Sequence, residues 1–339
     1  MDHMNNLATC LVPSALVLRL FPPFLHPIFV YITHSLNLIF RRRAVKVLGP
    51  YIEERLKIVR QQFAAGNKIC QRDDVLSWII TDAVKRNENQ EGLVDRIACR
   101  VFVAMFAAME TTTMTISFTL LDLCASDPAQ NVWEGLAEEG RRIFSAPVLD
   151  LATINISLPR ADSSLKETLR LRTSIKALAT EVTSAEGLVL EGYDVRLPLG
   201  SRLSVSAWGI HRDEAVYGPN ASEYDAFRFS RQTETELGQE QEQKRDVADG
   251  SAPSGPAART PSSGSNLMVT ATENYLPFGM GKHSCPGRYF AAVESKLFLA
   301  YLAANYDLKL TKGGRPNFVT IGHFPIPPMK GKLMVRRKK

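Results

Sequence analysis

Apolar residues recur at helical spacing along much of this sequence, and the pattern predicts several α-helices. The predicted helices cover residues 41–64, 73–84, 95–126, 163–171 and 289–303. The helix over residues 95–126 is the longest, and it is apolar around most of its circumference. Such a helix is typical of the middle of a hydrophobic core, so we expect it to run through the core.

Short apolar runs between residues 188 and 207 predict strands. Leu188–Leu190 and residues 193–197 flank Glu191-Gly192, a pair that favours a hairpin turn, and residues 202–207 form a third strand. Helices and strands together predict a mainly α fold with small β-sheets.

The stretch from residue 20 to residue 40 contains no Asp, Glu, Lys or Arg and is long enough to cross a bilayer. Prolines and histidines interrupt it, at Pro22, Pro23, His26, Pro27 and His34. Because proline breaks or kinks a helix, we expect an apolar helical hairpin that touches a membrane rather than a helix that spans one. The N-terminus lacks the basic start and the cleavage site of a signal peptide.

Composition changes between residues 231 and 270, where a run rich in Glu and Gln precedes one rich in Pro, Ser and Gly. Such a segment buries too little apolar surface to offset the entropy lost on ordering. We expect a disordered surface insertion within a single domain of residues 1–339, because motifs that belong together lie on both sides of it.

The chain of 339 residues has a formal net charge of +6, with basic runs at residues 41–43 and 336–339. Neither run contains aromatic residues, so we expect solvated surfaces and no nucleic-acid partner. None of the five cysteines belongs to a Cys-x-x-Cys pair. This pattern excludes a common zinc site and a secreted disulfide framework, and it favours a reducing, cytosol-facing environment.

One cysteine follows a glycine-rich turn, in the sequence Phe-Gly-Met-Gly-Lys-His-Ser-Cys-Pro-Gly-Arg of residues 278–288. Gly279 and Gly281 can adopt backbone conformations that other residues avoid, and they let a flat ligand approach the main chain. Pro286 suits the first position of the helix predicted to follow. Cys285 would then lie at a helix N-terminus, where the dipole lowers the pKa of a thiol. This arrangement suits a thiolate ligand of haem iron, whereas an isolated cysteine is more often buried and inert.

The cysteine turn resembles the haem loop F-G-x-G-x-[RH]-x-C-x-G of the cytochrome P-450 superfamily, and every defined position is present. The resemblance implies a P-450 fold that holds heme b, with Cys285 as the axial ligand of the iron. It also implies that His283 binds a haem propionate. The other loop residues expected at the cofactor are Phe278, Gly279, Gly281 and Gly287.

A Glu-x-x-Arg pair, Glu167 and Arg170, lies in the predicted helix 163–171, where residues three apart share a face. Residues 138/141 and 139/142 have the same spacing, but they lie in a strongly charged stretch that we expect to be solvated. The P-450 resemblance selects Glu167 and Arg170 and adds Arg228. It implies a buried structural triad in which one carboxylate serves two guanidinium groups.

The long predicted helix contains Ala-Ala-Met-Glu-Thr-Thr at residues 107–112. This run resembles the family motif A-[AG]-x-[DE]-T-[TS], whose small residues lie against the haem. The resemblance implies that Glu110 and Thr111 deliver protons to dioxygen, and that the Thr111 hydroxyl bonds back to the Ala107 carbonyl. A threonine-rich helix with one solvated glutamate is the alternative interpretation.

The resemblance further implies a monooxygenase that inserts one oxygen atom of O2 into an apolar small molecule, a secondary metabolite of a filamentous fungus. Electrons would come from NADPH-cytochrome P-450 reductase at the cytosolic face of the endoplasmic reticulum membrane, which residues 20–40 would contact. Residues 174–179 and 323–327 align with the family's substrate-facing loops.

The sequence departs from the family pattern on its N-terminal side. The Trp-x-x-x-Arg motif that grips a haem propionate occurs only as Trp208 and Arg212, in the predicted strand region. We therefore expect a P-450 fold that lacks its N-terminal part and binds haem poorly when expressed alone. An inactive remnant and a haem-thiolate isomerase or dehydratase are the alternative functions, although the Glu110-Thr111 pair argues against the isomerase.

Overall fold

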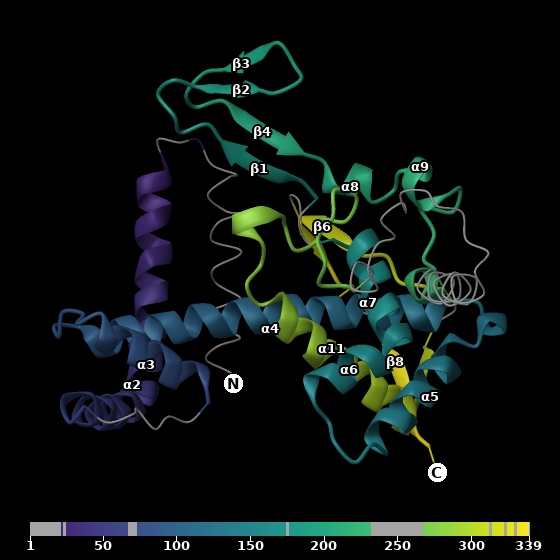
Figure 1. Ribbon diagram of the computed structural model, residues 1–339, viewed down its shortest axis with the longest axis horizontal. Coiled ribbons are helices and arrows are strands. Elements are labelled where there is room, and N and C mark those ends of the chain that lie inside the picture. Colours follow the sequence, from purple (N-terminus) through teal and green to yellow (C-terminus); the bar gives the residue numbers. More distant parts are fainter. Residues whose placement is uncertain are drawn as a thin grey trace, which may run out of the picture. The chain divides into compact units, whose positions relative to one another are not determined.

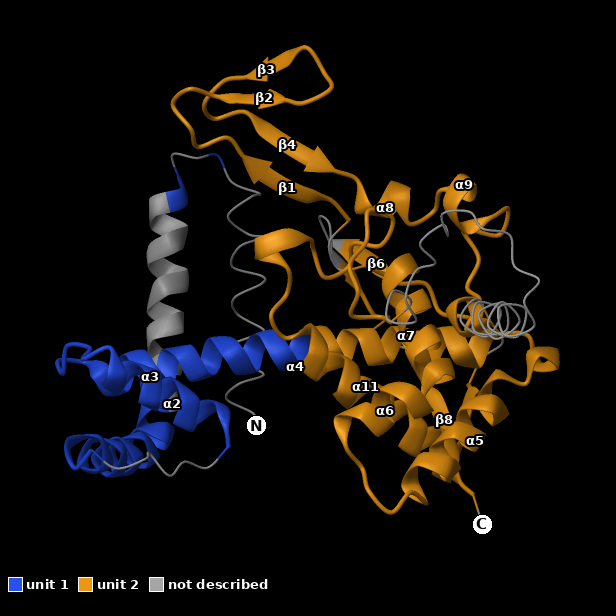
Figure 2. Ribbon diagram, in the orientation of Figure 1, with its two compact units in different colours: residues 1–110 blue, residues 111–339 orange. Residues whose placement is uncertain are grey.

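The computed structural model describes residues 22, 25–66, 73–173, 176–231, 267–311, 314–321, 324–328 and 331–338 (Figure 1). The chain divides into two compact units, residues 1–110 and residues 111–339, which Figure 2 shows in different colours. The boundary falls within helix α4 (Leu93–Ala125), so each unit contains part of this helix.

Unit 1 contains the long helix α2 (His26–Ala64), helix α3 (Val75–Lys85) and the first part of α4. Asp74 caps α3, because its carboxylate accepts a hydrogen bond from the Ser77 N–H at 2.8 Å. The Arg55 guanidinium bonds to the same carboxylate and lowers the pKa of Asp74 to about 2. The three helices bury one apolar cluster, which includes Ile52, Leu56, Ile80, Leu93 and Ile97.

The apolar hairpin predicted over residues 20–40 is wrong for the described part of that stretch. Residues 26–40 continue into residues 41–64 as the single helix α2. Pro27 lies in the first turn of this helix, where its missing N–H has no helical partner to lose, and Pro50 lies within the helix. Residues 20, 21, 23 and 24 are outside the described residues.

Four helices of unit 2 pack around its main hydrophobic cluster (Figure 1). They are α5 (Val132–Phe144), α6 (Leu151–Ser157), α7 (Pro159–Leu171) and α11 (Arg288–Asn305). Helices α5 and α11 meet at Gly140, where an added Cβ would lie only 2.2 Å from the Ala300 carbonyl oxygen. The cluster includes Leu136, Leu158, Ala161, Leu165, Met268, Tyr275, Leu299 and Ala300.

The described strands of unit 2 form small antiparallel sheets of two strands each. Strand β1 (Leu178–Glu181) pairs with β4 (Arg202–Val205), and β2 (Leu188–Leu190) pairs with β3 (Val195–Leu197). Strand β5 (Tyr306–Leu310) pairs with β8 (Leu333–Arg337), and β6 (Val319–Ile321) pairs with β7 (Phe324–Ile326). Short helices α8 (Ala207–Ile210) and α9 (Glu214–Tyr217) follow β4.

Helix α4 is less buried than its apolar sequence predicts. Near its C-terminus Phe118, Leu121 and Leu123 are buried, but Val103 is 68% exposed. The prediction that this helix runs through the core is therefore wrong for its middle part around Val103, whereas Leu93 and Ile97 nearer its N-terminus are buried. Among the described helices, α4 is the one long and apolar enough to cross a membrane by length and composition, and 17% of its most apolar window is buried.

The predicted fold class is confirmed, and the helices predicted over residues 73–84, 95–126 and 289–303 match α3, α4 and α11 to within two residues at each end. The hairpin of β2 and β3 is also confirmed, with Gly192 at φ +81° in its turn. Helices α5 and α6 and the strands after α11 are absent from the predictions. Residues 232–266 lie outside the described residues, and the single-domain organisation stays a prediction.

Candidate functional site

The cysteine loop closes on itself through backbone hydrogen bonds. The N–H of Cys285 donates to the Phe278 carbonyl oxygen at 2.7 Å, and the N–H of Gly279 donates to the Leu276 carbonyl oxygen at 3.0 Å. A turn of 3-10 helix, η3 (Gly281–His283), lies between these residues. The closed loop holds Cys285 beside the residues where the loop begins.

Both glycines of the turn have left-handed backbone, with φ +73° at Gly279 and φ +67° at Gly281. A side chain at either position would strain the backbone. At Gly281 no heavy atom lies within 4 Å of the place that a Cβ would take, so the main chain is uncovered there. A Cβ added at Gly287 would have one heavy atom within 4 Å, the Cys285 Sγ at 4.0 Å.

The Cys285 side chain is exposed and forms no disulfide. Its carbonyl oxygen accepts a hydrogen bond from Arg288 Nη1 at 2.8 Å. Helix α11 begins at Arg288, two residues after Pro286, so the prediction of Pro286 at the first helical position is wrong. His283 is exposed at the end of η3, and exposed apolar side chains near it in sequence are Met280, Tyr289 and Phe290.

Glu167 and Arg170 pair on α7, and neither side chain has exposed surface. Arg170 donates from Nε and Nη2 to the two carboxylate oxygens, both at 2.7 Å. Arg228, whose side chain is 7% exposed, donates from Nε to Glu167 Oε1 at 3.1 Å. The structure therefore places the three predicted residues around one buried carboxylate, which supplies the counter-charge that buried guanidinium groups require.

The two arginines of the triad also hold the chain that leads toward the cysteine loop. Arg170 Nη1 donates to the backbone carbonyls of His211 and Ala221. Arg228 Nη1 donates to the Tyr217 carbonyl at 2.8 Å. These bonds satisfy the guanidinium groups and fix the irregular segment that follows α8.

The loop and the triad both carry the pattern of one protein family, and the comparison extends over most of the sequence. The family described as "Cytochrome P450" matches residues 3–335. The chain belongs to the cytochrome P450 family.

Several fungal proteins resemble this P450 chain. It is 32% identical to the cytochrome P450 monooxygenase gloP of Glarea lozoyensis, over 100% of this chain and 60% of that protein. It is 30% identical to the cytochrome P450 monooxygenase polB of Polytolypa hystricis, over 96% of this chain and 59% of that protein. An ent-kaurene oxidase of Gibberella intermedia is 29% identical over 96% of this chain and 54% of that protein. The chain thus spans about 60% of the length of such relatives.

His211 of this P450 chain ties the triad to the cysteine loop, a role that nothing in the sequence indicates. Its ring is fully buried; Nε2 accepts a hydrogen bond from the Leu276 N–H at 2.9 Å, and Nδ1 lies 3.0 Å from the Arg170 carbonyl oxygen. Because Nε2 accepts, the proton is on Nδ1, which donates to Arg170. Burial lowers the pKa of His211 to about 4, so the ring is neutral at pH 7.

Glu139 contradicts the prediction that its charged stretch is solvated, because its side chain is buried. Its carboxylate accepts hydrogen bonds from the Arg160 N–H at 2.8 Å and the Ala161 N–H at 3.1 Å, in the first turn of α7. Burial raises the pKa of Glu139 to about 7 despite these bonds. Its neighbours Glu138 and Arg141 are exposed. Glu139 therefore satisfies the open N-terminus of the helix that carries the triad.

Glu110 and Thr111 are adjacent on α4, on either side of the boundary between the two units. Glu110 is half-buried and Thr111 is exposed. The Thr111 carbonyl oxygen accepts a hydrogen bond from the Thr115 hydroxyl at 2.9 Å, and the Thr115 carbonyl accepts one from the Thr119 hydroxyl at 2.8 Å. Such bonds often bend helices. The bond predicted between Thr111 and Ala107 stays a prediction.

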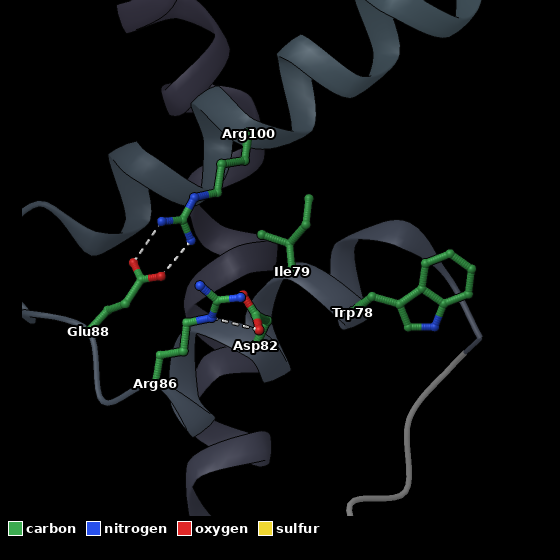
Figure 3. A pocket seen from close by; sticks show the side chains of 6 residues that line it. All are labelled: Trp78, Ile79, Asp82, Arg86, Glu88 and Arg100. Carbon is green, nitrogen blue, oxygen red and sulfur yellow. Dashed lines mark hydrogen bonds and ion pairs between the residues drawn. The ribbon is translucent and has the colours of Figure 1, made fainter. Parts of the chain in front are cut away.

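A surface hollow of about 420 Å³ lies in unit 1 and is lined by Trp78, Ile79, Asp82, Arg86, Glu88 and Arg100 (Figure 3). Figure 3 shows that its charged residues are already paired: Arg100 donates to both oxygens of Glu88, at 2.8 and 2.9 Å, and Arg86 donates to Asp82 at 2.9 Å. None of the predicted site residues lines it. We assign no ligand to this hollow, because its ion pairs satisfy one another.

The structure assembles the triad and orders the cysteine loop around Cys285. The roles assigned to the loop residues and to Glu110 and Thr111 stay predictions. Of the two segments expected to face a substrate, residues 174–175 and residue 323 lie outside the described residues.

Proposed function

We propose that this chain belongs to a haem-thiolate monooxygenase in which Cys285 is the axial ligand of heme b. One atom of O2 enters a C–H bond of an apolar small molecule and the other leaves as water, which consumes two electrons and two protons. Relatives named cytochrome P450 monooxygenase, and one named ent-kaurene oxidase, support this class of reaction. We also propose that the substrate is a fungal secondary metabolite.

The observation that carries the proposal is the exposed Cys285 sulfur on a loop shaped by left-handed glycines. A soft thiolate suits haem iron. The uncovered main chain at Gly281, and the absence of a side chain at Gly287 next to the sulfur, leave room for a flat ring. The loop therefore leaves space for a haem, and Phe278, Gly279, Gly281, His283 and Gly287 would be the residues that help to hold it.

When bound, haem supplies the activation of dioxygen and the oxidation of the C–H bond. The residues of this chain would hold the haem and deliver protons. Cys285 would hold the iron, and the hydrogen bond from its backbone N–H to the Phe278 carbonyl oxygen holds its main chain in place. Glu110 and Thr111 pass protons from water toward dioxygen, as an acid beside a hydroxyl can.

We propose that the electrons would come from a separate NADPH-cytochrome P450 reductase, as the family resemblance implies. We place the enzyme at the cytosolic face of the endoplasmic reticulum membrane. The uncharged stretch of residues 20–40 would contact that membrane.

The test of the proposal is Cys285→Ala in the haem-loaded protein. Its reduced form should lose the carbon monoxide difference spectrum typical of a thiolate ligand. The matched control is Cys124→Ala in α4, a thiol whose pKa burial raises to about 11, and this variant should keep the spectrum. A thiolate spectrum in Cys285→Ala, or a parent protein that no preparation can load with haem, would overturn the proposal.

A further inference from the structure

Asp122, near the C-terminus of α4, is a second buried carboxylate that serves two arginines. Its side chain is 1% exposed. Arg172 donates to it from Nε at 3.3 Å and from Nη2 at 3.1 Å, and Arg315 Nε pairs with its Oδ1. One carboxylate therefore joins guanidinium groups from two segments that are far apart in the sequence.

Two phenylalanine rings complete this cluster. The Phe318 ring lies edge-on to the Phe118 ring of α4, with centroids 5.8 Å apart. The Arg172 and Arg315 guanidinium carbons lie 5.3 and 5.6 Å from the centroid of the Phe318 ring. Each guanidinium group thus contacts both a carboxylate and an aromatic ring, which limits its freedom to move.

Each arginine stands at the start of a segment. Arg172 is the first residue after α7 and leads to β1, and Arg315 leads to the hairpin of β6 and β7. The two segments also meet directly, because Lys176 Nζ donates to Thr320 Oγ1 at 3.3 Å. Asp122 is therefore the point at which both segments attach to α4.

Loss of the Asp122 charge should disturb this cluster more than loss of either arginine. The cluster contains one negative and two positive groups, and burial lowers the pKa of Arg315 while Asp122 raises it. Without the Asp122 charge, two partly buried guanidinium groups would face each other and repel. Without one arginine, the remaining pair would still be neutral.

We infer that Asp122 sets the spacing between residues 176–181 and the β6–β7 hairpin, and through that spacing determines which shapes of apolar ligand the protein accepts. The second half of this inference rests on the proposed function and on the family resemblance, which implies that the described residues 176–179 and 324–327 face a substrate. Asp122 acts as a positioning residue, since it holds the two segments and is itself buried.

The spacing is tested by amide hydrogen exchange in Asp122→Asn, which keeps the side-chain shape and removes the charge. Exchange should accelerate roughly tenfold in both segments and stay unchanged in α11. Adding Arg315→Gln should slow exchange in residues 176–181 only in part, because it removes the repulsion between the arginines but leaves Arg172 without the Asp122 charge. The matched control is Asp307→Asn on β5, which breaks the exposed pair with Arg336 on β8 and should affect neither segment.

A single variant keeps the test decisive if Asp122→Asn does not fold. Arg315→Gln alone should loosen the β6–β7 hairpin and leave residues 176–181 as they are, because the Arg172–Asp122 pair persists. Unchanged exchange in the hairpin of Arg315→Gln, or acceleration in only one segment of Asp122→Asn, would overturn the inference.

Ligand selectivity is tested with alkylimidazoles of increasing chain length, which bind haem iron and shift its absorption spectrum. The ratio of Kd for a short and a long ligand should change roughly threefold or more in Asp122→Asn and should stay constant in Asp307→Asn. If the Kd ratio is unchanged although amide exchange is faster in Asp122→Asn, only the part of the inference that concerns ligand selectivity is overturned. A parent protein without a haem spectrum would overturn the proposed function and, with it, the part of the inference that concerns ligand selectivity. The amide exchange result would still test whether Asp122 sets the spacing of the two segments.

Discussion

The His211 imidazole and the Leu276 backbone N–H form a hydrogen bond of 2.9 Å that joins two parts of the predicted site. On its other side the ring bonds to the backbone carbonyl of Arg170, whose guanidinium group holds Glu167. Leu276 begins the loop that carries Cys285. The buried triad and the cysteine loop are therefore connected through a neutral, fully buried histidine.

His211→Gln should destabilise the protein most at neutral pH. The pKa of His211 is about 4 when folded, below its ordinary value of 6.5. Between these values the unfolded chain binds a proton that the folded protein does not, so the stability due to the neutral ring is present above pH 6.5 and is lost as pH falls toward 4. The difference in unfolding free energy between parent and variant should shrink by up to ~3 kcal/mol over that range.

Denaturant unfolding of both proteins from pH 4 to pH 7.5 measures this difference. The buried Glu139 titrates in the same range with the opposite sign, but it is present in both proteins and cancels. A difference that does not change with pH would mean that His211 has the same pKa in the folded and unfolded states, which would contradict the burial of a neutral ring.

Glu167→Ala should unfold the protein at a much lower temperature than the parent. It leaves Arg170 and Arg228 buried without a counter-charge, which costs about 3–5 kcal/mol for a broken buried pair. Thermal unfolding checks this prediction. The control is Glu134→Ala, which removes an exposed pair with Arg141 and should cost less than about 1 kcal/mol. Equal melting temperatures for the two variants would contradict the buried triad.

Gly140→Ala should also be strongly destabilising, although alanine is the better helix former. The added methyl group would meet the Ala300 carbonyl oxygen at 2.2 Å, so α5 and α11 would have to separate. Overpacking of this kind costs about 1–3 kcal/mol or more. Gly49→Ala in α2 is the control, because its nearest non-adjacent neighbour is Val94 Cγ1 at 3.8 Å. Gly49 precedes Pro50, which disfavours a Cβ in helical backbone, so a small loss of stability is expected there. Denaturant unfolding should show the larger loss for Gly140→Ala.

Thr111→Ala should leave haem binding intact and lower the product formed per NADPH consumed, if the proposed function is right. Loss of a positioned proton donor diverts electrons to peroxide. Acid–base groups contribute about a hundredfold or more to a reaction rate, so the effect should be large. Turnover with added reductase and an oxidisable substrate, together with a peroxide assay, measures the ratio. Thr113→Ala, at an exposed position of the same helix, should not alter it. An unchanged ratio in Thr111→Ala would show that this residue only packs.

Several features could be predicted from the sequence because their requirements are local. The turn before Cys285 needs left-handed backbone at Gly279 and Gly281, and glycine is the residue that adopts it without strain. Glu167 and Arg170 share a helix face because they are three residues apart. Helices α3, α4 and α11 follow from the period of their apolar residues.

Burial and long-range partners were decided only by the tertiary structure. Glu138 and Glu139 are adjacent in one charged stretch, yet only Glu139 is buried. Its carboxylate accepts hydrogen bonds from backbone N–H groups in the first turn of α7, whereas Glu138 bonds to the Arg160 side chain at the surface. The apolar sequence of α4 could not show that Val103 stays exposed, since exposure depends on which segments cover the helix. The partners of Asp122 lie 50 residues away at Arg172 and farther still at Arg315. Such pairings arise from the folding of distant segments against one another, and no local pattern encodes them.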